Sequence, residues 1–194
     1  MARSRVFDEE TALDRAMNTF WRKGYETTSI TDLTGAMEIN KGSLYHSFGS
    51  KQELFVRVFL KYNQAYRRAL LTRMSQYQNP EEAIAELFTE VLRQSLEDKE
   101  RKGCFLVNTS LEMAHHTGEV QDLVHQGMSE FEAFFVEQLT RAKTQGAVSD
   151  DLDLTQVAKA LLTLVVGMRV LARGVYGGGD LEMIRDQALR MLKP

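Results

Sequence analysis

Apolar residues recur every three or four positions along most of the chain, which is the spacing of a helix face buried against a core. One such stripe ends at Gly24, a second begins after Ser50, and a third begins at Pro80. Ser50 followed by Glu53 forms a capping box, and Asn79 before Pro80 combines an N-cap with proline at the first helical position. No run of alternating β-branched residues is long enough for a strand. The pattern therefore predicts an all-α fold of about nine helices.

The apolar pattern changes near the C-terminus. Between Leu154 and Tyr176 apolar residues cover nearly the whole circumference of the predicted helix, which requires burial on all sides. A final helix is predicted after Gly177–Gly179, with Asp180 as its N-cap. The triple glycine is interpreted as a linker, since no strand precedes it and no Lys-Ser/Thr follows it. The surplus apolar surface of two consecutive helices predicts a homodimer interface with two-fold symmetry.

The capping residues and apolar spacing of residues 27–48 predict two short helices joined by a tight turn. Asn40 caps the second helix, and its apolar residues Leu44 and Phe48 lie four positions apart, facing the core. The outward positions of that helix are Lys41, Gly42, Ser43, Tyr45 and His46. Such a pair of helices is a helix-turn-helix, whose second helix can enter a major groove. The same residues also fit an ordinary solvated face, so their types alone leave both interpretations open.

The outward residues have the chemistry that DNA binding needs. A helix N-terminus offers free amides and a positive dipole end to phosphate. Gly42 allows close approach of the backbone, Lys41 brings charge, and Ser43 can bond to a base edge. Tyr45 and His46 can reach phosphate oxygens, which position a helix without reading sequence.

Composition adds limits. The 194 residues include 24 Lys and Arg, 27 Asp and Glu, and one Cys, with 43% hydrophobic residues and a net charge of −3. A single Cys excludes an internal disulfide framework and a multi-cysteine metal site. No uncharged run exceeds nine residues, far below the ~20 that a membrane helix needs, and no signal-peptide core follows Met1. We expect no membrane partner and a cytoplasmic protein.

The net negative charge does not exclude binding to nucleic acid, because binding depends on where the charged side chains lie. Residues 1–51 hold as many acidic as basic side chains. The first predicted helix carries the acids Asp8, Glu9, Glu10 and Asp14. We expect the docking face to gather the cations Arg3, Arg5, Lys41 and Lys51.

Specific strings strengthen the helix-turn-helix interpretation. They are GYETTSI at 24–30, KGSLY at 41–45 and FGSKQELF at 48–55. In caps, core positions and spacing together, residues 7–55 resemble the DNA-binding domain of TetR-type (TetR/AcrR) transcriptional regulators. The resemblance implies a helix-turn-helix domain over residues 1–50 and a helical effector-binding and dimerisation domain over 51–194.

By this resemblance, the chain is expected to be a dimeric repressor that a small-molecule effector releases from a palindromic operator in double-stranded DNA. The implied DNA-contacting residues are Thr28, Ser29, Asn40, Lys41, Gly42, Ser43, Tyr45, His46 and Lys51. Two positions depart from the family pattern. Glu38 occupies the turn position that usually holds Gly, and would be strained by about 1 kcal/mol if its φ is positive. Ser47 replaces the usual His or Tyr, which moves the expected phosphate contact to His46.

The effector-binding half is less clear from sequence. The candidate lining residues are Phe88, Cys104, Asn108, Glu112, Met128, Phe131, Phe135 and Arg169. The aromatic residues among them equally fit a plain core, and the polar ones equally fit helix contacts, with Arg169 as a partner for Asn108 or Glu112. Cys104 follows Gly103 at a predicted helix N-terminus, where a thiolate is favoured. It is therefore a candidate redox or electrophile sensor as well as a candidate core residue.

Other functions have less support. His115 and His116 point about 100° apart on a helix, so we expect no metal site, and we expect no cofactor. No nucleophile–base pair stands at a recognisable spacing, so an enzyme is not expected. The rival interpretation is a helical ligand-binding or scaffold protein without DNA function, which Glu38 and Ser47 would favour.

Overall fold

The computed structural model describes residues 7–116 and 118–192, which are helical throughout apart from turns and loops. In chain order the elements are α1 (Glu9–Lys23), α2 (Ile30–Met37), α3 (Lys41–Phe48), α4 (Lys51–Tyr62), a π-helical segment (Asn63–Arg68), α5 (Ala69–Ser75), α6 (Pro80–Glu97), α7 (Phe105–Leu111), a 3₁₀ turn (Met113–His115), α8 (Gly118–Thr144), α9 (Leu154–Leu171) and α10 (Gly178–Arg190). Because α4, the π-helical segment and α5 are continuous, the described residues form nine helical rods. The all-α prediction is confirmed.

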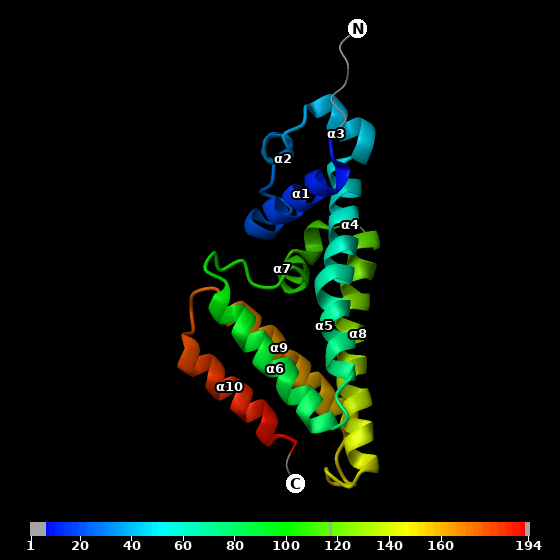
Figure 1. Cartoon of the computed structure of the whole chain (residues 1–194), viewed down its shortest axis with the longest axis vertical. Helices are drawn as coiled ribbons and strands as arrows, with labels where there is room; N and C mark the ends of the chain where they lie inside the picture. The colour runs from blue at the N-terminus through cyan, green and yellow to red at the C-terminus, as the bar shows by residue number, and fades with distance from the viewer. Residues whose placement is uncertain (1–6, 117, 193–194) are drawn as a thin grey trace.

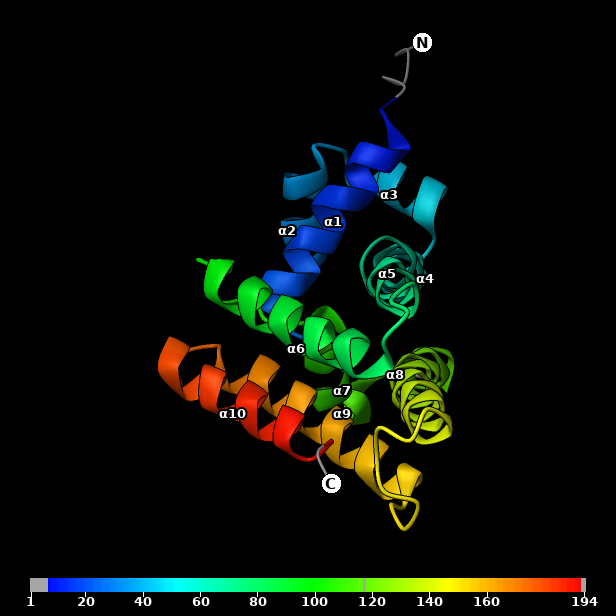
Figure 2. The same cartoon turned by 60° about the horizontal axis from the view of Figure 1, so that its bottom comes forward.

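The helices form two groups along the molecule. In Figure 1, α1, α2 and α3 surround one end of the α4–α5 rod, which then runs down the length of the molecule beside α8. Figure 2 shows α6, α9 and α10 beside one another on one side of the rod and α8. Helix α9 packs against α8, α6 and α10. The rod therefore belongs to both groups and connects them mechanically.

Local capping explains where the helices begin. At α4, the Ser50 hydroxyl accepts a bond from the Glu53 amide (3.1 Å) and the Glu53 carboxylate accepts one from the Ser50 amide (2.6 Å). At α6, Asn79 Oδ1 accepts from the two amides that follow Pro80 (2.9 and 3.2 Å). Helix α1 ends at Gly24, whose φ of 85° suits a residue without a Cβ. These predicted boundaries are confirmed.

The predicted start of the last helix needs correction. Helix α10 begins at Gly178, not after Asp180, and Gly177 is the N-cap residue. Asp180 stands in the first turn, where its carboxylate accepts a bond from the Gly177 amide (3.0 Å). The glycines are therefore a linker only in part, because tertiary packing of Leu181 overrides their low helix propensity. The apolar pattern predicts an unbroken α-helix where the structure has the π-helical segment Asn63–Arg68.

Helix α9 leaves much of its apolar surface uncovered in a single chain. By length and composition it could cross a membrane, with a mean hydropathy of 1.5 over Leu154–Leu171, but only 28% of that window is buried. The buried residues, such as Leu161 and Val165, lie on one side of the helix. Burial on all sides, which the pattern predicts, thus requires a further surface that this chain alone does not supply.

Candidate DNA-binding surface and effector cavity

Capping side chains set the angle between α2 and α3. The Ser29 hydroxyl caps α2 by accepting from the Asp32 amide (3.0 Å), and the Asp32 carboxylate accepts from the Ser29 amide (2.9 Å). Between the helices, Glu38 adopts the left-handed conformation with φ 58° and ψ 37°. Asn40 then caps α3 by accepting from the Ser43 amide (2.8 Å). Glu38 therefore has the positive φ that is expected at a turn position where the family usually has glycine.

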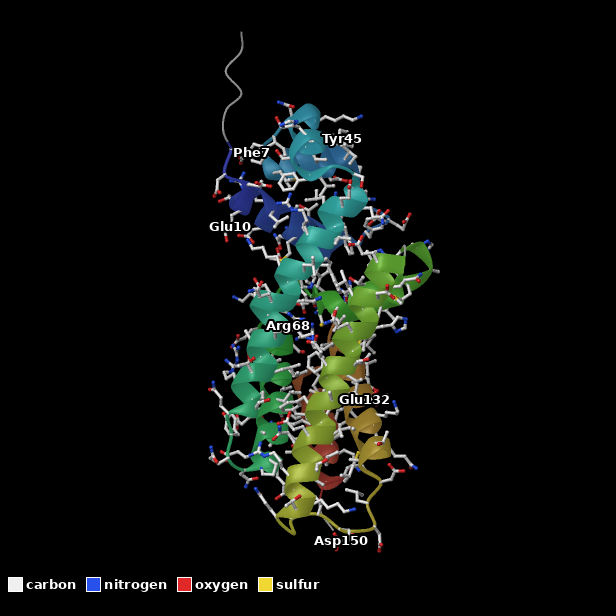
Figure 3. All side chains as sticks on the ribbon, turned by 90° about the vertical axis from the view of Figure 1, so that its right-hand side faces the viewer. Phe7, Glu10, Tyr45, Arg68, Glu132 and Asp150 are labelled. Atoms are coloured by element: carbon white, nitrogen blue, oxygen red, sulfur yellow. The ribbon has the colours of Figure 1, made fainter. Side chains whose placement is uncertain are left out.

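The outward face of α3 lies at one tip of the molecule. Lys41, Gly42, Tyr45 and His46 are exposed, with Tyr45 44% exposed, while Ser43 is half-buried. Figure 3 shows Tyr45 at the end of the molecule opposite Asp150. The Lys41 ammonium lies 5.8 Å from the centre of the Tyr45 ring, as their spacing of four residues predicts. These side chains are free to meet a ligand surface.

A buried side and one arginine hold α3 in place. Leu44 and Phe48 are buried against the core as predicted. Arg57 on α4 donates to the Ser47 carbonyl (3.0 Å), lies 4.8 Å from the centre of the Phe48 ring, and pairs with Glu9 of α1 (2.6 Å). The C-terminal end of α3 is therefore tied to two other helices, which fixes the direction in which its N-terminal end points.

The acidic residues of α1 are paired away from the α3 tip. Lys61 on α4 lies 2.5 Å from Asp14 and 3.7 Å from Glu10. Figure 3 places Glu10 to the side of the rod, well below Tyr45. Because these carboxylates face α4 cations, they do not neutralise the positive charge of Lys41. Of the cations expected on the docking face, Lys41 is exposed at the α3 tip, apart from these acids, whereas Arg3 and Arg5 lie outside the described residues.

Two of the implied DNA contacts are engaged elsewhere. Thr28 is only 1% exposed, and its hydroxyl donates to the Gly24 carbonyl (2.6 Å). Its side chain is therefore not on the outward surface, because it closes the turn after α1. Lys51 is half-buried, with its ammonium 4.4 Å from the centre of the Tyr25 ring and 3.5 Å from the Glu26 carbonyl.

A cavity of about 360 Å³ lies between the α4–α5 rod, α6, α8 and α9. Four of the predicted effector residues line it, namely Cys104, Met128, Phe131 and Arg169. The sequence did not identify the contributions of the rod and of α6, among them Tyr62, Tyr66, Arg67, Arg73, Glu90 and Gln94. Tyr62, Tyr66 and Arg73 recur at helical spacing. This polar and aromatic face of the rod is the sequence signal that could have indicated its part in the cavity.

The other four predicted residues do not line this cavity. Phe88 and Phe135 are fully buried in the core, with ring centres 6.1 Å apart. Asn108 donates to the Lys102 carbonyl (2.6 Å), and Glu112 accepts from the Tyr25 amide (2.9 Å). Asn108 and Glu112 thus make structural contacts, and Arg169 bonds to Ser95 and Gly103 instead of to either of them.

The cavity wall contains ionised and sulfur-bearing groups. Glu90 lies 3.3 Å from Arg73 and 2.7 Å from Arg93, and hydrogen bonding from Arg93 is the main reason that its pKa falls to about 2. Arg67 is buried and pairs with Glu130 of α8. The Tyr62 hydroxyl lies 3.3 Å from Cys104 Sγ, and burial raises the pKa of Tyr62 well above its usual value.

Several contacts connect the cavity region to the α1–α3 group. The indole of Trp21 donates to the Gly103 carbonyl (3.2 Å), next to Cys104. On the other side of α7, the Glu112 carboxylate accepts from the Tyr25 amide (2.9 Å). His116 stacks on Phe55 of α4, with ring centres 5.0 Å apart. The loop and turn on both sides of α7 therefore contact the C-terminal end of α1 directly.

Comparisons with known proteins agree with this architecture. Residues 12–58 match the model for "Bacterial regulatory proteins, tetR family", and residues 80–176 match that for "Tetracyclin repressor-like, C-terminal domain". The chain is 30% identical to the uncharacterized HTH-type transcriptional regulator YezE of Bacillus subtilis, covering 96% of this chain and 95% of YezE. It is 27% identical to the HTH-type transcriptional repressor ComR of Escherichia coli, covering 97% and 90%.

A solved structure extends the likeness to three dimensions. A cysteine mutant of the TetR family regulator CifR, complexed with 26-base-pair operator DNA, superposes with a TM-score of 0.84. The two sequences are 33% identical over 97% of this chain and 98% of that one. The helix-turn-helix, the helical C-terminal half and these relatives all indicate a regulator rather than an enzyme. The chain belongs to the TetR family of bacterial transcriptional regulators.

Proposed function

We propose that this regulator is a cytoplasmic, dimeric repressor that binds a palindromic operator and leaves it when a small molecule fills the cavity between the rod, α6, α8 and α9. The exposed outward face of α3, at the end of the molecule where Figure 3 labels Tyr45, is the observation that supports DNA binding most directly. The repressor function of ComR and the operator-bound state of CifR support the same proposal.

The proposed DNA contacts come from the exposed tip. Lys41 and the amides at the start of α3 would bind phosphate, while Gly42 allows close approach and Ser43 faces base edges. Tyr45 and His46 would contact backbone phosphates. Ser29 and Asn40 belong to the same surface, although their side-chain oxygens already cap helices.

We further propose that residues 1–50 bind DNA and residues 51–194 bind the effector and the second subunit. The boundary falls where the rod begins, so α4 packs on α1 while α5 lines the cavity. A change at the cavity can therefore move the α1–α3 group through the rod, as well as through the contacts of Trp21 and Tyr25.

The proposed dimer would use α9 and α10. Apolar residues on the open side, such as Leu164 and Leu171 of α9 and Met183 of α10, remain partly or largely exposed in one chain. A C₂ interface would bury the same face on both subunits. The charged Lys159 and Arg169 within α9 and the family assignment favour this partner over a membrane for the apolar helix.

Two recognition helices must then reach the same face of DNA together. Successive major grooves on one face repeat about every 34 Å, so a few ångströms of splay between subunits prevents simultaneous docking. An effector causes release only if it binds the splayed arrangement more tightly than the docked one.

A salt titration with Lys41→Ala tests the DNA-binding proposal. Binding to the DNA upstream of its own gene should weaken, and the slope of log affinity against log salt should become shallower by about one unit for each phosphate that each subunit no longer neutralises. The control is Lys99→Ala, which removes another exposed cation, from the loop before Gly103. If both variants bind DNA with the salt slope of the parent protein, Lys41 does not bind phosphate. If the parent protein does not bind this DNA even at low salt, the ligand-binding or scaffold interpretation is favoured.

A second candidate function places the sensor at Cys104. Its sulfur lines the cavity and lies beside the Tyr62 hydroxyl, so an oxidant or electrophile that enters the cavity would meet it. Full alkylation of Cys104, the only cysteine of the chain, should release operator DNA if this is the sensing chemistry. Unchanged DNA affinity after complete modification would exclude it.

A further inference from the structure

We propose that the cavity binds an organic anion with an apolar body, and that Arg169 receives its carboxylate. This inference rests on the proposed effector role of the cavity and adds the chemical class of the ligand. It begins from the charge of Arg169, which the rest of the site does not balance.

Arg169 is a buried cation with neutral partners only. It is 8% exposed, lies on α9 and lines the cavity. Its guanidinium donates to the Ser95 hydroxyl (3.1 Å) and, more weakly, to the Gly103 carbonyl (3.5 Å). Within residues 7–116 and 118–192, no carboxylate lies within ion-pair distance of it. A guanidinium has five N–H donors and keeps its charge in proteins, so this burial is costly until an anion arrives.

The other two arginines of the cavity already have acids. Arg67 pairs with Glu130, and Arg73 pairs with Glu90. Because the pKa of Glu90 is about 2, that carboxylate stays ionised at neutral pH beside its own cations. Among the three arginines that line the cavity, Arg169 is therefore the one without a carboxylate partner in the described part of the chain.

The surroundings of Arg169 describe the rest of the ligand. Tyr62 and Cys104 lie at the same end of the cavity, where the charge of Arg169 acts on the Tyr62 hydroxyl. Met128, Phe131 and Val166 provide apolar wall. A volume of about 360 Å³ falls within the range of small-molecule sites. The chemistry therefore fits a small amphiphilic acid, with its charged end at Arg169 and its apolar body against α8 and α9.

Occupation of Arg169 would reach α1 by a short route. The Gly103 carbonyl accepts from Arg169 and also from the indole of Trp21 on α1 (3.5 and 3.2 Å). A carboxylate that bonds bidentately to the guanidinium takes over the donors now shared with Ser95 and Gly103. The Gly103 carbonyl, which accepts from Trp21, then loses one of its two donors.

A matched pair of ligands tests the charge requirement without DNA. Octanoate and 1-naphthoate, each compared with its primary amide, are titrated against the whole protein while the melting temperature and Trp21 fluorescence are recorded. At least one acid should stabilise the protein and bind about tenfold to hundredfold more tightly than its amide, the usual advantage of a hydrogen bond to a charged group.

Variants on α9 assign the preference to one residue. Arg169→Gln should remove the preference for acid over amide, and Arg169→Lys should keep part of it, because the charge remains. Arg173→Gln is the control, since Arg173 lies in the turn just after α9, is exposed and does not line the cavity. It should bind the acids as the parent protein does.

Several results would overturn the proposal. They are equal binding of acid and amide, an unchanged acid preference in Arg169→Gln, or a parent protein that none of the acids stabilises. Release of operator DNA is measured separately on the same samples. An acid that binds through Arg169 without releasing DNA would contradict the effector role of the cavity while leaving the anion site intact.

Discussion

Replacing Glu38 with Gly and with Ala separates backbone strain from side-chain contacts in the turn between α2 and α3. Both variants lose the ion pair between the Glu38 carboxylate and Arg15 (2.7 Å), whose partners are 73% and 40% exposed. Only the Ala variant keeps a Cβ at φ 58°. Left-handed backbone costs an L-residue with a Cβ roughly 1–2 kcal/mol, and the greater unfolded-state freedom of Gly offsets about 0.4–1 kcal/mol of that difference.

The Gly variant should therefore be more stable than the Ala variant by about 0.5–1 kcal/mol. For a chain of this length that corresponds to a melting temperature roughly 1–4 °C higher. Calorimetry or circular dichroism at equal protein concentration measures the difference, which keeps any dimer contribution constant.

The same exchange at a helical position provides the control. Ala36 lies in α2, two residues before Glu38, with ordinary helical geometry. There Ala36→Gly should lower stability by roughly 0.5–1 kcal/mol. If the same residue, Gly or Ala, gives the more stable protein at both positions, the left-handed conformation is not the source of strain in the turn, and the reasoning fails.

Three further changes test other parts of the structure. Gly127→Val should destabilise the protein by roughly 1–3 kcal/mol, seen as a lower melting temperature, since even a Cβ there would lie 2.9 Å from a Leu106 methyl carbon; an unchanged melting point would contradict this packing. Glu112→Ala leaves the Tyr25 amide without its acceptor and should cost about 1–3 kcal/mol, with faster hydrogen exchange at that amide as the site-specific readout. Burial lowers the pKa of His116 below 6.5, so the unfolded chain binds more protons and this residue's share of stability is lost as pH falls below about 6.5; in His116→Phe that part of the pH dependence should disappear, and an identical pH profile would refute the assignment.

Helix ends were predictable because their signals are local. The caps at Ser50 and Asn79 and the stop at Gly24 depend on neighbouring residues only, and the structure has all three. Asp180 misled the prediction because a carboxylate at the third helical position serves the same end of the helix as a capping residue does. The correct start at Gly178 depends on packing of the whole helix, which no local string specifies.

The site was less predictable, since its side chains come from distant segments. Thr28 belongs to a string that resembles the family pattern, yet its hydroxyl turns inward to the Gly24 carbonyl. Arg169 was a candidate for both the cavity and a helix contact, and its actual partner Ser95 is 74 residues away. Periodicity shows which face of a helix is apolar, but the partner that meets that face depends on tertiary packing.

The π-helical segment at Asn63–Arg68 sets an angle as well as a path. A regular α-helix advances about 100° per residue, and a single wide turn admits one additional residue without breaking the rod. Removal of one residue within this segment can be absorbed by return to ordinary helix, so both ends keep their facing. The same deletion in Lys51–Tyr62 or Ala69–Ser75 would rotate the α1–α3 group about the rod axis by roughly 100° relative to the cavity. The π-helical segment is therefore the one stretch of the rod that can lose a residue while the α3 tip keeps its azimuth relative to the cavity.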